Sequence, residues 1–148
     1  MNILQKYYNT ISQIEKARFI PLLFIRLVLA YGFYKPAAMK WQDINGIAEW
    51  FESIDIPAPL LNAYMAAGTE TLGVILLTLG LGTRFISIPL IITMLVAIKT
   101  VHLSNGFEAG NNGYEIPLYY SIMLITLFVG GSGKASLDYL IEKKFIKK

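Results

Sequence analysis

Four long apolar stretches dominate the hydrophobic pattern of this chain, at about residues 19–39, 60–81, 85–103 and 114–130. A helix that crosses a bilayer needs about 20 mainly apolar residues, and each stretch is close to that length. The strict apolar and polar alternation of a membrane β-barrel is absent from them. The pattern therefore predicts an all-α, integral membrane four-helix bundle, formed by one domain over residues 1–148 that ends in a basic tail at residues 131–148.

A secretory signal peptide is the alternative interpretation of the first stretch. Against it, a polar lead-in at residues 1–18 precedes the apolar run, no clean small-x-small cleavage site follows it, and Arg26 lies inside it. We therefore expect this stretch to be kept as a membrane span.

A shorter, amphipathic pattern fills the segment between the first two spans. Apolar side chains recur there at helical spacing, with acidic residues between them: Trp41, Ile44, Ile47, Trp50, Phe51 and Ile54. Pro57 and Pro59 end the pattern before the second span begins. We predict a short interfacial helix, which serves either as an anchor in the membrane surface or as a lid over a site between the spans.

Composition supports a membrane protein and excludes several kinds of chemistry. Hydrophobic residues make up 55% of the 148 residues and charged residues only 16%, whereas soluble domains carry about 25% charged residues. The chain has no cysteine and one histidine, which excludes disulfides, thiolate nucleophiles, Cys-ligated clusters and a multi-His metal site. We expect no metal, no intrinsic cofactor and no nucleic-acid partner, and the lipid bilayer is the first partner that the composition indicates.

The basic residues favour one orientation of the bundle in the membrane. They gather before span one, between spans two and three, and after span four: Lys6, Lys16, Arg18, Arg84, Lys134, Lys143, Lys144, Lys147 and Lys148. Lys35 and Lys40 lie toward the other side, among more numerous acidic residues. Because basic loops stay in the cytoplasm, both termini are predicted to be cytoplasmic.

Ionisable residues inside the spans are the candidate functional residues: Arg26, Glu70, Lys99, His102 and Glu115. A charge at the centre of an inserting helix costs about 2.5–3.5 kcal/mol, so such residues normally face the bundle interior and pair. Depths estimated from a rise of about 1.5 Å per residue make an Arg26–Glu70 contact feasible. Lys99 and His102 share a helical face, and Glu115 enters the next span at the same level, which predicts a second cluster.

Stripes of residues at helical spacing predict the inward face of three spans. The expected stripes are Arg26, Ala30, Phe33, Ala37 and Lys40 on span one, Ala66, Glu70, Gly73, Leu77 and Gly80 on span two, and Glu115, Tyr119, Ile122 and Thr126 on span four. The buried charges either lock the helices together or bind a ligand and relay protons, because histidine titrates near neutral pH.

The chain resembles the DoxX family of small bacterial membrane proteins. The residues that carry the resemblance are Arg26-Leu27, Gly32-Phe33, Lys40, Glu70-Thr71-Leu72-Gly73, Leu79 to Arg84, Gly113-Tyr114-Glu115 and Gly130 to Asp138. Where many members have His-Gly, this chain has Tyr34-Lys35-Pro36-Ala37. The residues expected to have structural roles are Gly73, Gly80, Gly82, Arg84, Lys40, Ser136 and Asp138. The resemblance implies a bundle in the bacterial cytoplasmic (inner) membrane and an association with quinone-linked redox systems.

Three hypotheses for function remain open from the sequence. The favoured one is a subunit or accessory of a quinone-linked membrane oxidoreductase, which binds an apolar small molecule between its helices and has a membrane or soluble redox partner. The chain shows no electron carrier of its own, so electrons would come from the ligand or the partner. The alternatives are a small transporter or permeation module, and a non-catalytic structural subunit that binds a partner, including a second copy of the chain.

Overall fold

The computed structural model describes residues 2–146, and all regular elements in that range are helical. The tail residues Lys147 and Lys148 lie outside the described residues. The α-helices are α1 (Ile3–Lys16), α2 (Phe19–Gln42), α3 (Ile44–Ser53), α4 (Pro59–Leu79), α5 (Thr83–Ala97), α6 (Glu115–Gly130) and α7 (Leu137–Ile141). Four short segments complete them: η1 (Ile98–His102), η2 (Leu103–Asn105), η3 (Ala109–Asn111) and η4 (Glu142–Ile146).

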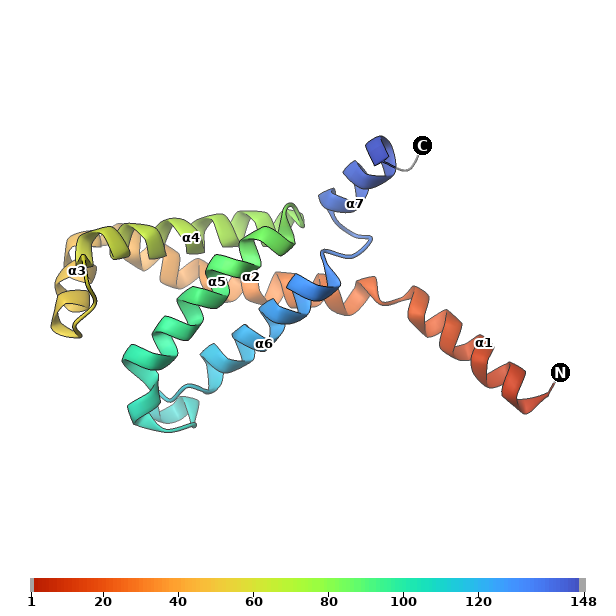
Figure 1. The fold of residues 1–148 in the computed structure, drawn as a ribbon, viewed down its shortest axis with the longest axis horizontal. Coiled ribbons are helices and arrows are strands. Elements are labelled where there is room, and N and C mark those ends of the chain that lie inside the picture. The colour runs from red at the N-terminus through yellow and green to blue at the C-terminus, as the bar shows by residue number, and fades with distance from the viewer. Residues whose placement is uncertain (1, 147–148) are drawn as a thin grey trace.

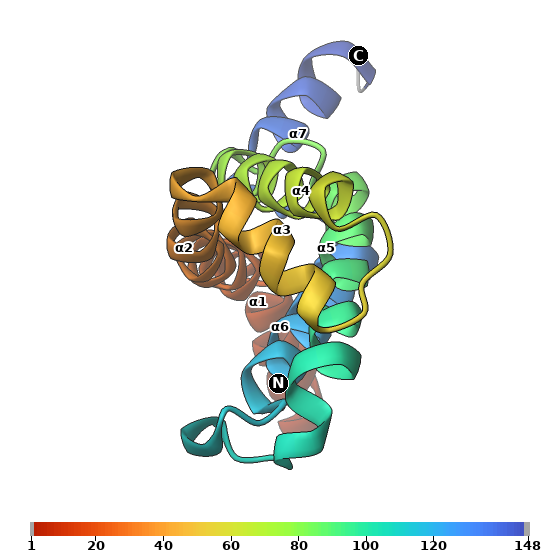
Figure 2. The ribbon, with the colours of Figure 1, turned by 90° about the vertical axis from the view of Figure 1, so that its left-hand side faces the viewer.

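The four long apolar helices form two pairs. Helix α2 packs mainly on α4, and α5 packs mainly on α6. Figure 1 shows the two pairs close together where α4 turns into α5, and further apart toward the opposite end. We call the first end the termini end, because α1 and α7 lie there, and the second the α3 end, where α3 and residues 103–114 lie. Figure 2 looks at the α3 end and shows α3 lying across it.

A tight link between α4 and α5 holds the termini end together. Gly80 and Gly82 both have left-handed backbone, with φ of 64° and 57°, a conformation that glycine adopts without steric cost. The link closes with a hydrogen bond of 3.0 Å from the Leu81 amide to the Leu76 carbonyl. The connections at the α3 end are longer, so the helix pairs have room there to diverge.

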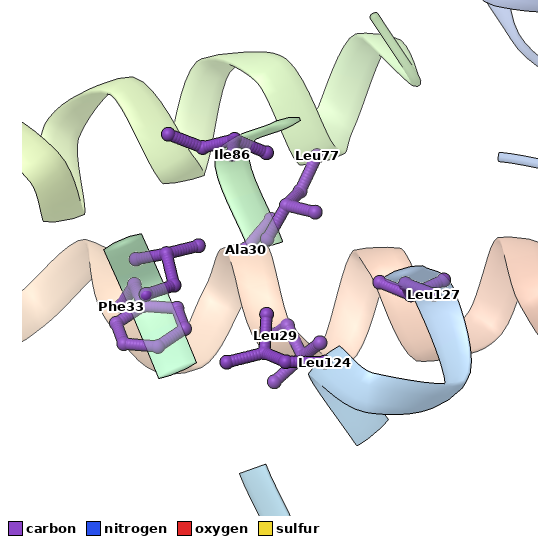
Figure 3. Close-up of a cluster of buried hydrophobic side chains, with 8 residues drawn as sticks. Leu29, Ala30, Phe33, Leu77, Ile86, Leu124 and Leu127 are labelled. Carbon is purple, nitrogen blue, oxygen red and sulfur yellow. The ribbon is translucent and has the colours of Figure 1, made fainter. Parts of the chain in front are cut away.

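The packed apolar core lies between the helix pairs (Figure 3). Its buried members come from all four long helices: Leu29, Ala30, Phe33, Leu77, Ile86, Leu90, Leu124 and Leu127. Many other large apolar side chains of these helices are exposed, among them Phe24, Phe85 and Val129. Apolar side chains on the outside of a bundle that is also apolar inside are typical of a protein surrounded by lipid.

The predicted all-α membrane fold is confirmed. Three helical stretches are long and apolar enough to cross a membrane: Ile3–Gln42, Pro59–Leu79 and Thr83–Asn105. The fourth predicted span corresponds to α6, which has only 16 residues. At about 1.5 Å per residue, α6 covers about 24 Å, less than the hydrocarbon thickness of about 30 Å. The lead-in, expected only to be polar, forms the helix α1.

Two of the three predicted inward stripes are confirmed. In α2, Arg26, Ala30, Phe33 and Ala37 are buried, and in α4, Glu70, Gly73 and Leu77 are buried. The stripe predicted for α6 is wrong, because Tyr119 and Ile122 are 45% and 53% exposed. The buried face of α6 consists of Pro117, Ser121, Leu124 and Leu127. Helix α6 is apolar on every side, so its periodicity contains little information about which face turns inward.

Candidate functional site

A cavity of about 560 Å³ lies between the helix pairs toward the α3 end. Its walls come from α2, α3, α4, α5 and α6, together with η1 and the segment that follows it. Most of the lining is apolar, and aromatic rings contribute from several elements, among them Phe33, Trp50, Phe51 and Tyr120. A largely apolar cavity with a few polar groups is the usual form of a small-molecule site, and the volume is within the usual range of about 300–1,000 Å³.

The amphipathic segment predicted between the first two spans forms part of this wall. Helix α3 begins after Asp43, whose carboxylate accepts a hydrogen bond of 2.9 Å from the Gly46 amide. Trp50, Phe51 and Ile54 line the cavity, and Phe51 is buried. Helix α3 therefore forms part of the cavity wall, a position compatible with both predicted roles, an anchor in the membrane surface and a lid over a site between the spans.

An ion pair between Lys40 and Glu70 forms the polar part of the cavity wall. Lys40 Nζ donates to both carboxylate oxygens of Glu70, at 3.0 Å to Oε1 and 2.8 Å to Oε2. Both residues line the cavity, and the side chains are only 16% and 4% exposed. The pair connects α2 to α4 and leaves the site with no net charge from these two groups.

The predicted Arg26–Glu70 contact is wrong. Arg26 is fully buried as expected, but Nη1 donates to the Leu77 carbonyl at 3.0 Å and Nη2 donates to the Ala135 carbonyl. Glu70 turns instead to Lys40, which the sequence analysis placed among the structural residues. The lysine side chain is long and reaches back along α2. Depth estimates from backbone positions did not include the length of this side chain.

The residues around Arg26 form a closed node at the termini end, which holds the segment after α6. Asp138 accepts hydrogen bonds from the amides of Gly82 and Thr83, at 2.8 and 3.3 Å, and so caps the start of α5. Ser136 caps α7 by accepting from the Tyr139 amide at 3.2 Å. A Cβ on Gly80 would lie 2.2 Å from Arg26 Nη1, so the close approach of the arginine requires glycine there.

Two further glycines pack closely or turn the chain: Gly73, which was expected to be structural, and Gly131, which was not. A Cβ on Gly73 would lie 2.9 Å from Leu90 Cδ1, so this glycine lets α4 approach α5. Gly131 follows α6 with φ of 77°, and a Cβ there would lie 3.3 Å from Arg84 Nε. Arg84 thus lies beside the end of α6, near the start of the segment that the Arg26 node holds.

The second predicted cluster does not form. His102 lines the cavity, but its Nδ1 lies 2.8 Å from the Asn112 carbonyl oxygen. Glu115 accepts from the Ala109 amide at 3.0 Å and is not part of the cavity wall. Lys99 is exposed and has no hydrogen bond or ion pair within residues 2–146. Of the three residues, His102 alone therefore keeps a position at the site.

Three prolines inside or near the start of helices line the cavity, and the sequence analysis did not use them. They are Pro36 in α2, Pro89 in α5 and Pro117 in α6. A proline cannot donate to the carbonyl four residues earlier, so Pro36 leaves the Gly32 carbonyl without its normal helical partner. Gly32 also lines the cavity.

Beyond the last turn of α5, the chain continues through a π-helical segment, Ile98–His102, and such segments often occur at functional sites.

No group of three or more His, Cys, Asp or Glu side chains within residues 2–146 is placed to hold a metal ion. The ionisable residues on the cavity wall are Lys40, Glu70, His102 and Tyr120. The wall can therefore bind a ligand mainly by apolar contact, with hydrogen bonds at its polar part.

Comparison with known proteins gives one family and several relatives of similar length. The model of the family described as DoxX matches residues 21–103. An uncharacterized protein of Haemophilus influenzae is 35% identical over 133 residues, which are 87% of this chain and 88% of that protein. A second H. influenzae protein, also uncharacterized, is 32% identical over 93% of this chain and 99% of its own length. A Bacillus subtilis protein named "Putative oxidoreductase CatD" is 31% identical over 84% of this chain and 89% of its own length. No solved structure matches the chain.

Proposed function

Because this chain belongs to the DoxX family, we propose that it is a membrane subunit or accessory of a quinone-linked oxidoreductase system, and that it binds an apolar, ring-shaped small molecule between its helices. The observation that carries the proposal is the cavity of about 560 Å³, with aromatic and aliphatic walls and one buried ion pair. Such a cavity provides stacking surfaces for a ring and a hydrogen-bonding position for its polar substituent.

Two arguments support a redox role. One relative has a name that includes the word oxidoreductase. A quinone also has the shape and polarity that the cavity accommodates, and it would itself carry the electrons. In this role the protein holds and orients the molecule, while a partner protein supplies or accepts the electrons. His102, at the cavity wall beside the Asn112 carbonyl, is the residue we propose for proton exchange with the ligand.

The proposed location is the bacterial cytoplasmic membrane, with both termini in the cytoplasm. Arg18, Arg84 and Lys134 all belong to the termini end, in agreement with the rule that basic segments stay inside. The cavity then lies toward the outer half of the membrane. We also propose that residues 1–148 form one domain, because the segment after α6 is held by hydrogen bonds to α2 and to the α4–α5 link.

A binding experiment with a quinone tests the proposal. The full chain, purified in detergent, is titrated with menadione while tryptophan fluorescence is recorded. Trp50 lines the cavity, so a bound quinone should quench it. We expect saturable quenching in the native chain. The Ala66→Phe variant fills part of the cavity and should weaken binding by at least about tenfold.

The matched control is Val129→Phe, which adds a ring at a position that is 69% exposed and outside the cavity wall. This variant should bind menadione like the native chain. Absence of saturable quenching in the native chain, or equal binding by both phenylalanine variants, would contradict the proposal.

A further inference from the structure

Lys40 and Glu70 place a compensated pair of charges at the wall of an otherwise apolar cavity. An ammonium group has three N–H donors. Two hydrogen bonds of 3.0 and 2.8 Å join Nζ to the two oxygens of Glu70. Within residues 2–146 these two are the hydrogen bonds that Nζ makes, so one donor remains for a ligand. The wall can thus donate a hydrogen bond without being a free cation.

A charge on a bound ligand would interact strongly with the Lys40–Glu70 pair at this position. Both side chains are largely buried, where water screens charges poorly. The ionisable groups on the cavity wall are Lys40, Glu70, His102 and Tyr120, and Lys40 and His102 are the basic ones, so no further basic side chain among the lining residues could compensate an incoming anion. A carboxylate ligand would have to share Lys40 with Glu70, and two carboxylates close together repel each other. A ketone or quinone oxygen accepts the remaining N–H with no change in net charge.

We propose that the Lys40–Glu70 pair makes the cavity selective for ligands with a neutral carbonyl or hydroxyl group, and that it excludes anionic ligands of the same shape. This inference rests on the proposed binding function and assigns its specificity to two residues. Lys40 contacts the ligand, whereas Glu70 acts through Lys40 by neutralising its charge and so positions it as a donor.

A pair of nearly isosteric ligands tests the inference. Acetonaphthone and naphthoate have the same ring system, and they differ in that a methyl ketone replaces a carboxylate. Binding of each to the full chain in detergent is measured by tryptophan quenching, at the same pH for all ligands. We expect the native chain to bind acetonaphthone at least about tenfold more tightly than naphthoate. Methyl naphthoate, which has lost the charge, should recover the binding, and this step requires no variant.

Variants then locate the selectivity in the pair. In Glu70→Gln, Lys40 becomes an uncompensated cation in a buried site, so naphthoate should bind at least about tenfold better than in the native chain. The double variant Lys40→Gln/Glu70→Gln has neither charge, and the gain in naphthoate binding should disappear. Glu115→Gln is the matched control, because it makes the same change outside the cavity wall, and it should leave the selectivity unchanged.

The outcomes separate this inference from the proposed function. If the native chain binds acetonaphthone and naphthoate equally well, or if Glu70→Gln leaves naphthoate binding unchanged, the pair does not set the specificity, while the cavity remains a binding site. If no neutral ring-shaped ligand binds in a saturable way, including menadione, the binding function itself is wrong.

Discussion

The two ends of the bundle differ in what surrounds their buried charged side chains. At the termini end, Arg26 is fully buried and donates to two backbone carbonyls, from Leu77 and Ala135. At the α3 end, Lys40 and Glu70 are almost as buried, but they lie at the wall of a cavity. The first charge is enclosed by protein on every side, whereas the second pair faces space that another molecule can occupy.

The comparison shows that the depth of a charge in a membrane protein does not by itself identify a functional site. Arg26 uses two of its nitrogens, Nη1 and Nη2, to fasten a separate segment of chain to α2 and α4, while its buried Nε has no hydrogen-bond partner among the described residues. The Lys40–Glu70 pair also joins two helices, and its remaining donor lies beside the cavity. What distinguishes the two is therefore the space around the charge.

The largest effect should come from Arg26→Met, which removes the charge but keeps much of the side-chain volume. The Leu77 and Ala135 carbonyls then lose a charged donor, so we expect a loss of about 3 kcal/mol in the free energy of unfolding. The segment that Arg26 holds should also become more mobile. Faster tryptic cleavage after Lys134, together with a lower unfolding temperature in detergent, would show both effects.

Lys99→Met is the control for this change, because Lys99 is exposed and has no hydrogen bond or ion pair within the described part of the chain. It should leave both the unfolding temperature and the cleavage rate close to those of the native chain. If Arg26→Met were as stable as Lys99→Met, the node would have no structural role and the contrast between the two ends would fail.

An intermediate effect is expected from Gly80→Ala. Alanine at this left-handed position costs about 1–3 kcal/mol in strain, and its Cβ would also lie 2.2 Å from Arg26 Nη1. Gly82→Ala is a close match, because Gly82 is also left-handed but a Cβ there meets nothing within 4 Å. Gly80→Ala should therefore lower the unfolding temperature more than Gly82→Ala does. Equal shifts would mean that Arg26 does not require the glycine.

The smallest effect is expected from Glu115→Gln. The glutamine oxygen can still accept from the Ala109 amide, and Glu115 is not part of the cavity wall. Stability should change by less than about 0.5 kcal/mol, and menadione binding should stay the same. A large loss of binding in this variant would restore the predicted cluster of Lys99, His102 and Glu115 as the site.

The sequence was sufficient to predict which faces of α2 and α4 turn inward. Both helices contain a charged residue and small residues on one stripe, and a buried charge has a strong preference for the interior. Helix α6 has no such residue in its apolar part, and its predicted face was wrong. The successful predictions therefore came from the position of charged residues, and not from apolar periodicity.

The partners of the buried charges could not be predicted from the sequence. Arg26 donates to main-chain carbonyls, which every residue has, so no pattern of side chains identifies them. Lys40 is near the end of α2 and reaches Glu70 through the length of its side chain. A site between the helices was predicted, but the residues on its wall could not be, because they depend on how the helix pairs diverge. The three prolines on its wall, Pro36, Pro89 and Pro117, were the available signal.

The short length of α6 has a consequence for the lipid around it. A helix of 16 residues covers about 24 Å. A bilayer with a hydrocarbon core of about 30 Å must therefore thin beside it, or residues of the flanking loop must cross the rest of the core. Pro117 and Tyr120, in the first turns of this helix, form part of the cavity wall. Mechanical stress from hydrophobic mismatch would therefore be transmitted to the cavity itself, and membranes of different thickness would present the same protein with differently shaped sites.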